Sequence, residues 1–110
     1  MVTRAYTYFS LALAAASPAF AQESGDASRG LTYARDLCAA CHAVLAIDAK
    51  SPRPDAPPFK AVANTPGMTG TALAVWLRTP HKSMPNLIIE PGDLNNVIAY
   101  IVSLREKRPM

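Results

Sequence analysis

Two cysteines and a histidine stand together in the stretch Cys38-Ala39-Ala40-Cys41-His42. Thiols two residues apart can form thioether bonds to the two vinyl groups of a haem, and the histidine that follows is then brought to the iron as an axial ligand. The sequence contains no further cysteine, so neither thiol is left over. We interpret the motif as the covalent attachment site of one haem c.

Three other interpretations of the cysteine pair are weaker. A redox-active disulfide of the thioredoxin type requires a βαβ setting, which the helical patterns along the chain do not provide. A zinc site requires four ligands, and the two cysteines and two histidines of the whole chain would all be needed to supply them. Chance occurrence of the pentapeptide is disfavoured by the export signal at the N-terminus, because bacteria attach haem c outside the cytoplasm.

A second axial ligand separates electron carriers from haem enzymes and gas binders. Met84 is the candidate, because it lies 42 residues after His42 and directly before Pro85, which stiffens the loop that would hold the thioether. Met68 competes with it, although a methionine at a helix edge is more often a core residue. His81 is a further alternative, and an open sixth site is another.

The surroundings of the haem can also be predicted. A methionine ligand would raise the reduction potential relative to a second histidine. Apolar side chains would act in the same direction by excluding water, and the candidates are Phe59, Leu73, Trp76, Leu77, Leu87 and Ile98. The second nitrogen of the His42 imidazole needs a hydrogen-bond acceptor, for which the carbonyl oxygens of Pro57 and Pro58 are the candidates.

The apolar pattern along the chain predicts an all-α fold. Helices are predicted where apolar residues recur at spacings of three and four, or in one short turn, over residues 26–38, 59–63, 71–78 and 91–104. Loops are predicted for residues 51–58, which contain four prolines, and for residues 81–90. Gly30 lies inside the first predicted helix and indicates a close approach of another segment.

Residues 1–21 have the layout of a secretory signal peptide. Arg4 precedes a short apolar run over residues 9–16, and Ala21 ends a group of small residues of the kind that signal peptidase requires. The run is shorter than the roughly 20 residues that span a bilayer. We therefore expect cleavage after Ala21, and export of a single domain, residues 22–110, to the periplasm.

The charge distribution does not suggest nucleic-acid binding. The formal net charge is +3, and the basic residues are scattered singly except for a group at the end of the chain. We expect that group, Arg105, Lys107 and Arg108, to stabilise the C-terminus of the last helix.

Together these residues make the chain similar to the class I cytochromes c. Gly30 and Tyr33, which precede Cys38, resemble the N-terminal helix of that family. Residues 56–59 resemble its proximal loop, Met84-Pro85 its distal ligand loop and residues 99–101 its C-terminal helix. The resemblance implies a cytochrome c fold, with N- and C-terminal helices packed across each other around one covalently bound haem. It also implies contact between Gly30 and Tyr100.

The leading functional hypothesis is an electron-transfer protein rather than an enzyme. It would carry single electrons between redox protein partners, for example in a respiratory chain, through transient docking at a haem edge ringed by Lys60, Arg78 and Lys82. The alternative is a haem enzyme or sensor whose open or labile sixth site reduces peroxide or binds a small gas. A third hypothesis is association with a membrane oxidase or dehydrogenase complex.

Overall fold

The computed structural model describes residues 2–3, 5, 7–12, 14 and 25–107. The predicted cleavage site after Ala21 lies outside these residues. Within the described residues there are helices and no strands, which confirms the all-α prediction. The helices are α1 (Ala27–Leu37), α2 (Phe59–Ala63), α3 (Gly70–Arg78) and α4 (Pro91–Ser103).

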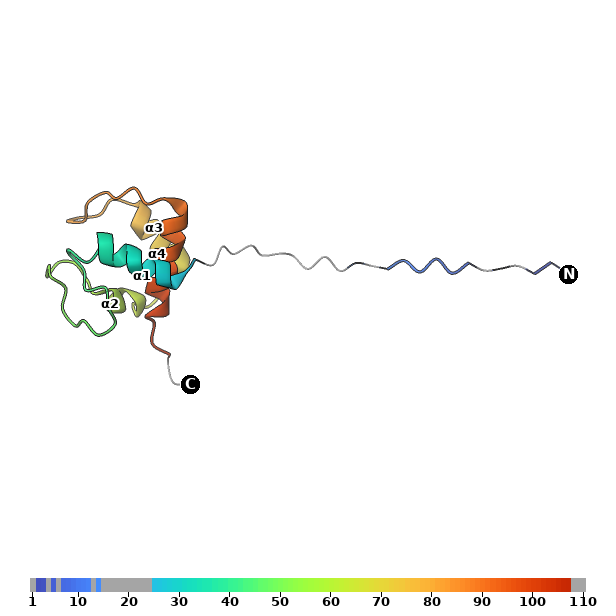
Figure 1. Ribbon diagram of the computed structural model, residues 1–110, viewed down its shortest axis with the longest axis horizontal. Coiled ribbons are helices and arrows are strands. Elements are labelled where there is room, and N and C mark those ends of the chain that lie inside the picture. Colours follow the sequence, from blue (N-terminus) through green and yellow to red (C-terminus); the bar gives the residue numbers. More distant parts are fainter. Residues whose placement is uncertain (1, 4, 6, 13, 15–24, 108–110) are drawn as a thin grey trace.

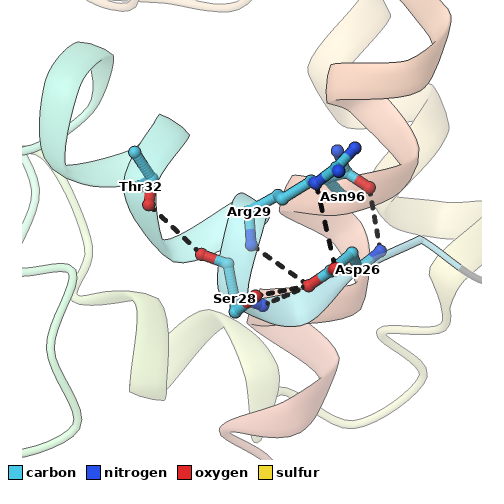
Figure 2. Close-up of polar contacts among 5 residues, drawn as sticks. All are labelled: Asp26, Ser28, Arg29, Thr32 and Asn96. Carbon is cyan, nitrogen blue, oxygen red and sulfur yellow. Dashed lines mark hydrogen bonds and ion pairs between the residues drawn. The ribbon is translucent and has the colours of Figure 1, made fainter.

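Helix α1 begins where Asp26 caps it. The Asp26 carboxylate accepts hydrogen bonds from the backbone N–H groups of Ser28 and Arg29, at 2.9 and 3.2 Å, and these groups would otherwise lack a partner. The backbone N–H of Asp26 itself donates to Oδ1 of Asn96 in α4, 2.8 Å away. Figure 2 shows Asp26 between the first turn of α1 and Asn96. The cap therefore also ties α1 to α4.

Helices α1 and α4 cross at Gly30. A Cβ atom at this position would overlap the backbone carbonyl of Asn96 and would lie 2.7 Å from Cβ of Tyr100. Only glycine allows the two backbones to approach so closely. The contact between Gly30 and Tyr100 that the family resemblance implies is therefore confirmed.

Helix α4 supplies the central face of the core. Pro91 occupies its first turn, as predicted, and Asp93 lies favourably near its N-terminus. The buried side chains of α4 recur at helical spacing and are Leu94, Val97, Tyr100 and Ile101. Helices α1, α2 and α3 all pack against α4. Figure 1 shows the loop before α2 and the loop between α3 and α4 extending to the same side of helices α1 and α4.

The predicted helix boundaries are close to the observed ones. Helix α2 has the predicted bounds, and α3 begins one residue earlier than predicted, at Gly70. The reason is Thr69, whose Oγ1 accepts a hydrogen bond from the backbone N–H of Ala72 at 3.1 Å and caps the helix. None of the described helices combines the length and apolar character needed to cross a membrane.

The predicted role of Arg105 at the end of the last helix is wrong. Helix α4 ends at Ser103 with no basic residue in its last turn. The Arg105 guanidinium instead donates to the backbone carbonyls of Ala63, at 3.2 Å, and Met68. It thereby ties the end of the described chain to the connection between α2 and α3.

Candidate haem-binding site

A cavity of about 470 Å³ lies between the two loops, and it brings the predicted site residues together. Cys38, Cys41, His42 and Met84 all line it. Five of the six apolar side chains predicted around the haem also line it, namely Phe59, Leu73, Trp76, Leu77 and Leu87. The sixth, Ile98, is not among the lining residues and packs against the helical core instead.

The two cysteines and the histidine lie on a turn that continues from the end of α1. The backbone N–H of Cys38 donates to Ala34 O at 2.9 Å, and the N–H of His42 donates to Cys38 O at 2.9 Å. These bonds have helical spacing, so the turn holds all three side chains in a fixed relation to α1. The position of α1 therefore determines where the attachment motif faces.

Both cysteines are half-buried and neither forms a disulfide in the part of the chain that the structure describes. Burial raises the pKa of the Cys38 thiol to about 11, and the neighbouring Cys41 adds to the shift. At neutral pH the free thiol is therefore protonated. A redox-active dithiol needs a low thiol pKa, so this environment does not suit one.

The loop before α2 holds the His42 ring through a hydrogen bond. Its Nδ1 lies 2.7 Å from the carbonyl oxygen of Pro57, which confirms one of the two predicted acceptors. Because a carbonyl can only accept, Nδ1 carries the proton and Nε2 of the neutral ring keeps its lone pair. The Phe59 ring packs beside the imidazole at a centroid distance of 5.3 Å. His42 is thus oriented as a metal-ligating histidine is.

Further hydrogen bonds hold the loop over residues 43–58. The backbone N–H of Phe59 donates to Ala43 O at 2.8 Å, which closes the loop. The hydroxyl of Tyr100 donates to the carbonyl oxygen of buried Val44 and so ties the loop to α4. The apolar pattern of the last helix does not predict this second bond. Its one signal is a hydroxyl within the apolar stripe of the last helix, because a buried tyrosine needs a partner for its O–H.

The three candidates for the second axial ligand line the same cavity, so the lining alone does not separate Met84 from Met68 and His81. Their local contacts do differ. Met68 packs against the core, and its backbone carbonyl accepts from Arg105. His81 is held by Trp76 and Thr79. Met84 lies on the loop between α3 and α4, beside Pro85.

Charged side chains also line the cavity. Arg53 and Asp55 are two of them, and they form an exposed ion pair with Nε and Oδ1 3.4 Å apart. Of the three cations predicted around the haem edge, Lys82 lines the cavity, whereas Lys60 and Arg78 are not among the lining residues. Lys60 pairs with Glu106 at 3.1 Å.

A comparison with known proteins identifies the family. The chain is 36% identical over 95 residues to "Cytochrome c-552" of Bradyrhizobium diazoefficiens (strain JCM 10833 / BCRC 13528 / IAM 13628 / NBRC 14792 / USDA 110). The alignment covers 86% of this chain and 90% of the relative. The chain belongs to the class I c-type cytochromes. No protein-family model matches this cytochrome, and no solved structure matches it.

As a c-type cytochrome, the protein carries covalently bound haem c with its iron and exchanges electrons with redox protein partners. The cavity fits this cofactor. Two thiols and a histidine with an available Nε2 lie on its wall, and the rest of the lining is mainly apolar. The helices form the cytochrome c fold that the sequence predicts.

Proposed function

We propose that this cytochrome is a periplasmic carrier of single electrons with histidine and methionine ligation. Cys38 and Cys41 form the thioether bonds, and His42 and Met84 hold the iron. The observation that carries the proposal is the cavity of about 470 Å³, because it is lined by all four side chains. The choice of Met84 over Met68 and His81, which line it too, rests on the place of Met84 directly before Pro85 in the loop. When bound, the haem supplies a one-electron couple between ferric and ferrous iron.

Each ligand has a distinct part in this proposal. The bond from His42 to Pro57 O keeps the proton on Nδ1, so Nε2 is the ligating atom. The thioether of Met84 favours ferrous iron and raises the reduction potential. Apolar lining residues such as Phe59 and Leu73, both buried, restrict water near the iron and act in the same direction.

The proposed location follows from the sequence of the N-terminal residues. Residues 1–21 act as a signal peptide that is removed after Ala21, and residues 22–110 form the exported domain. Periplasmic fractions should contain a haem protein whose N-terminus is Gln22. A mature protein that retains residues 1–21, or that is recovered from washed membranes alone, would contradict this proposal.

The optical spectrum of the holoprotein tests the ligation. We expect a low-spin spectrum with a weak far-red sulfur-to-iron band in the ferric state. The band should disappear in Met84→Ala and persist in Met68→Leu, which is the matched control on the same cavity. A high-spin wild type would instead favour a haem enzyme or sensor. A low-spin spectrum that Met84→Ala leaves unchanged would move the ligand to Met68 or His81.

A further inference from the structure

We propose that His81 is a positioning residue. Its contacts with Trp76 and Thr79 hold the loop that carries Met84, and they thereby determine how firmly Met84 keeps the sixth coordination position. This inference rests on the proposed role of Met84 as a ligand. It assigns His81, which was itself a candidate ligand, a different task in the same site.

The His81 ring is held on two sides. Its Nδ1 lies 2.9 Å from the carbonyl oxygen of Thr79, which can only accept, so Nδ1–H is the donor. The ring also meets the indole of Trp76 edge-on, with the centroids 5.2 Å apart and an interplanar angle of 82°. This is a favourable arrangement for two aromatic rings. Two contacts of different kinds therefore fix one side chain.

Both partners of His81 belong to the end of α3. Trp76 lies in the last turns of the helix, and Thr79 is its C-terminal cap. The Thr79 hydroxyl donates to the backbone carbonyl of Val75 at 2.6 Å, which holds Thr79 against the last turn. The His81 contacts thus connect the loop to a helix that packs against α4.

Met84 is connected directly to His81. The backbone N–H of Met84 donates to His81 O at 3.2 Å, which closes a tight turn over residues 81–84. In the described part of the chain, this is the one backbone-to-backbone hydrogen bond within residues 79–89. Regular structure therefore does little to hold the loop, and the side-chain contacts of His81 become more important.

The turn itself adopts an unfavourable backbone conformation. Ser83 has φ of 71°, in the left-handed region that glycine favours at the third position of such a turn. A non-glycine residue keeps this conformation only where its surroundings impose it. The contacts between His81 and α3 are the observed restraint next to this turn.

The consequence concerns competition at the iron. A loop held in its binding conformation presents its thioether at a high effective concentration, whereas a loosened loop yields more readily to an external ligand. Imidazole is a suitable probe, because its binding to ferric haem displaces the methionine. If His81 and Trp76 restrain the loop together, removal of either should strengthen imidazole binding.

The test measures the imidazole dissociation constant of the ferric holoprotein by the Soret shift. For His81→Ala and for Trp76→Leu we expect this constant to fall by about 3- to 10-fold. The dissociation constant of the double variant should be no lower than that of the single variant with the larger effect, because the two side chains form one contact. The far-red sulfur-to-iron band should be lost at a lower temperature, while helix melting in the far-ultraviolet changes little.

Two further variants provide the controls. Ile88→Ala changes a side chain of the same loop that is 93% exposed, so it should bind imidazole with wild-type affinity. Trp76→Phe keeps an aromatic partner for His81 and should restore most of the wild-type affinity relative to Trp76→Leu.

The outcomes separate this inference from the ligation itself. If the far-red band depends on Met84 and yet His81→Ala binds imidazole like the wild type, the positioning role is wrong while the ligation stands. Additive effects in the double variant would overturn the role as well. If Met84→Ala leaves the low-spin spectrum intact and His81→Ala abolishes it, His81 is the ligand, and both proposals fail.

Discussion

His42 and Pro57 lie 15 residues apart, and the Nδ1–H of His42 donates to the Pro57 carbonyl oxygen over 2.7 Å. The bond selects the tautomer in which Nε2 is free to bind iron, and it orients the ring. It joins the attachment motif, which continues from α1, to the proline-rich loop before α2. The proposed ligand and the group that orients it therefore come from two different segments.

The ligand role of His42 can be tested by replacing its side chain with a free ligand. His42→Gly should lose the low-spin spectrum, because the covalent haem would keep its thioether bonds but lose its histidine. Added imidazole should restore a low-spin spectrum by occupying the space that the side chain leaves. A wild-type spectrum of His42→Gly before imidazole is added would show that another residue is the ligand.

The crossing of α1 and α4 predicts a large effect of one methyl group. Gly30→Ala should lower the free energy of unfolding by about 1–3 kcal/mol, because its Cβ would overlap the Asn96 carbonyl. Denaturant unfolding followed by circular dichroism measures this. Gly92→Ala is the matched control, since nothing lies within 4 Å of a Cβ there, and it should be neutral or stabilising. Equal effects at both positions would contradict the close crossing.

The hydroxyl of Tyr100 is expected to stabilise the loop that follows the attachment motif. Tyr100→Phe leaves the carbonyl of Val44, which is 4% exposed, without this donor, and should reduce stability by about 1–3 kcal/mol. Tyr33→Phe provides the control, because the described structure gives the Tyr33 hydroxyl no hydrogen bond and the change should be below about 0.5 kcal/mol. Thermal unfolding of both variants distinguishes the loss of the hydrogen bond between Tyr100 and Val44 from a general effect of removing a hydroxyl.

The cap of α1 predicts a dependence on acid pH. The hydrogen bond from the Ser28 side chain, followed by the backbone bonds from Arg29 and Ser28, lowers the pKa of Asp26 below its ordinary value of 3.8. A lowered carboxyl pKa stabilises the folded state above the unfolded pKa, and this contribution is lost as the pH falls through the folded pKa. The stability advantage of the wild type over Asp26→Asn should thus shrink below about pH 4. Denaturant unfolding of both proteins at pH 7 and pH 3 measures the difference between their free energies of unfolding. A difference that is the same at both pH values would exclude the effect.

Without haem we expect the chain to fold poorly. The cavity of about 470 Å³ would expose its apolar lining to water, and the domain is small. Protein produced without haem attachment should show no cooperative thermal transition near that of the holoprotein. A cooperative transition of the haem-free protein at the same temperature would contradict this expectation.

Several features of the site could be predicted from the sequence because they depend on neighbouring residues. The attachment motif places two thiols and an imidazole within five residues, so its chemistry needs no long-range contact. The bounds of α2 and the start of α4 at Pro91 follow from local signals as well. Helix α3 was predicted one residue short, because the cap at Thr69 was not recognised.

Other features were left open or were missed because they depend on distances between remote segments. The choice of Pro57 over Pro58 as acceptor depends on how the proline-rich loop folds back on His42. The role of Arg105 was predicted wrongly, because a tertiary contact with Ala63 and Met68 takes the place of a local helix-end interaction.

The sequence by itself determined the helical class and the family resemblance, and it gave the proposal for haem attachment at residues 38–42, because spacing along one chain encodes all three. The tertiary structure alone decided which groups meet. It brought the Tyr100 hydroxyl to Val44, and it placed the His81 ring against Trp76, while the N–H of Met84 donates to the carbonyl oxygen of His81. The bond between Tyr100 and Val44 joins residues 56 positions apart, so it depends on how α4 packs against the loop that follows residue 42. Such packing depends on burial and on backbone clashes throughout the domain, so a local sequence pattern does not predict which groups come into contact.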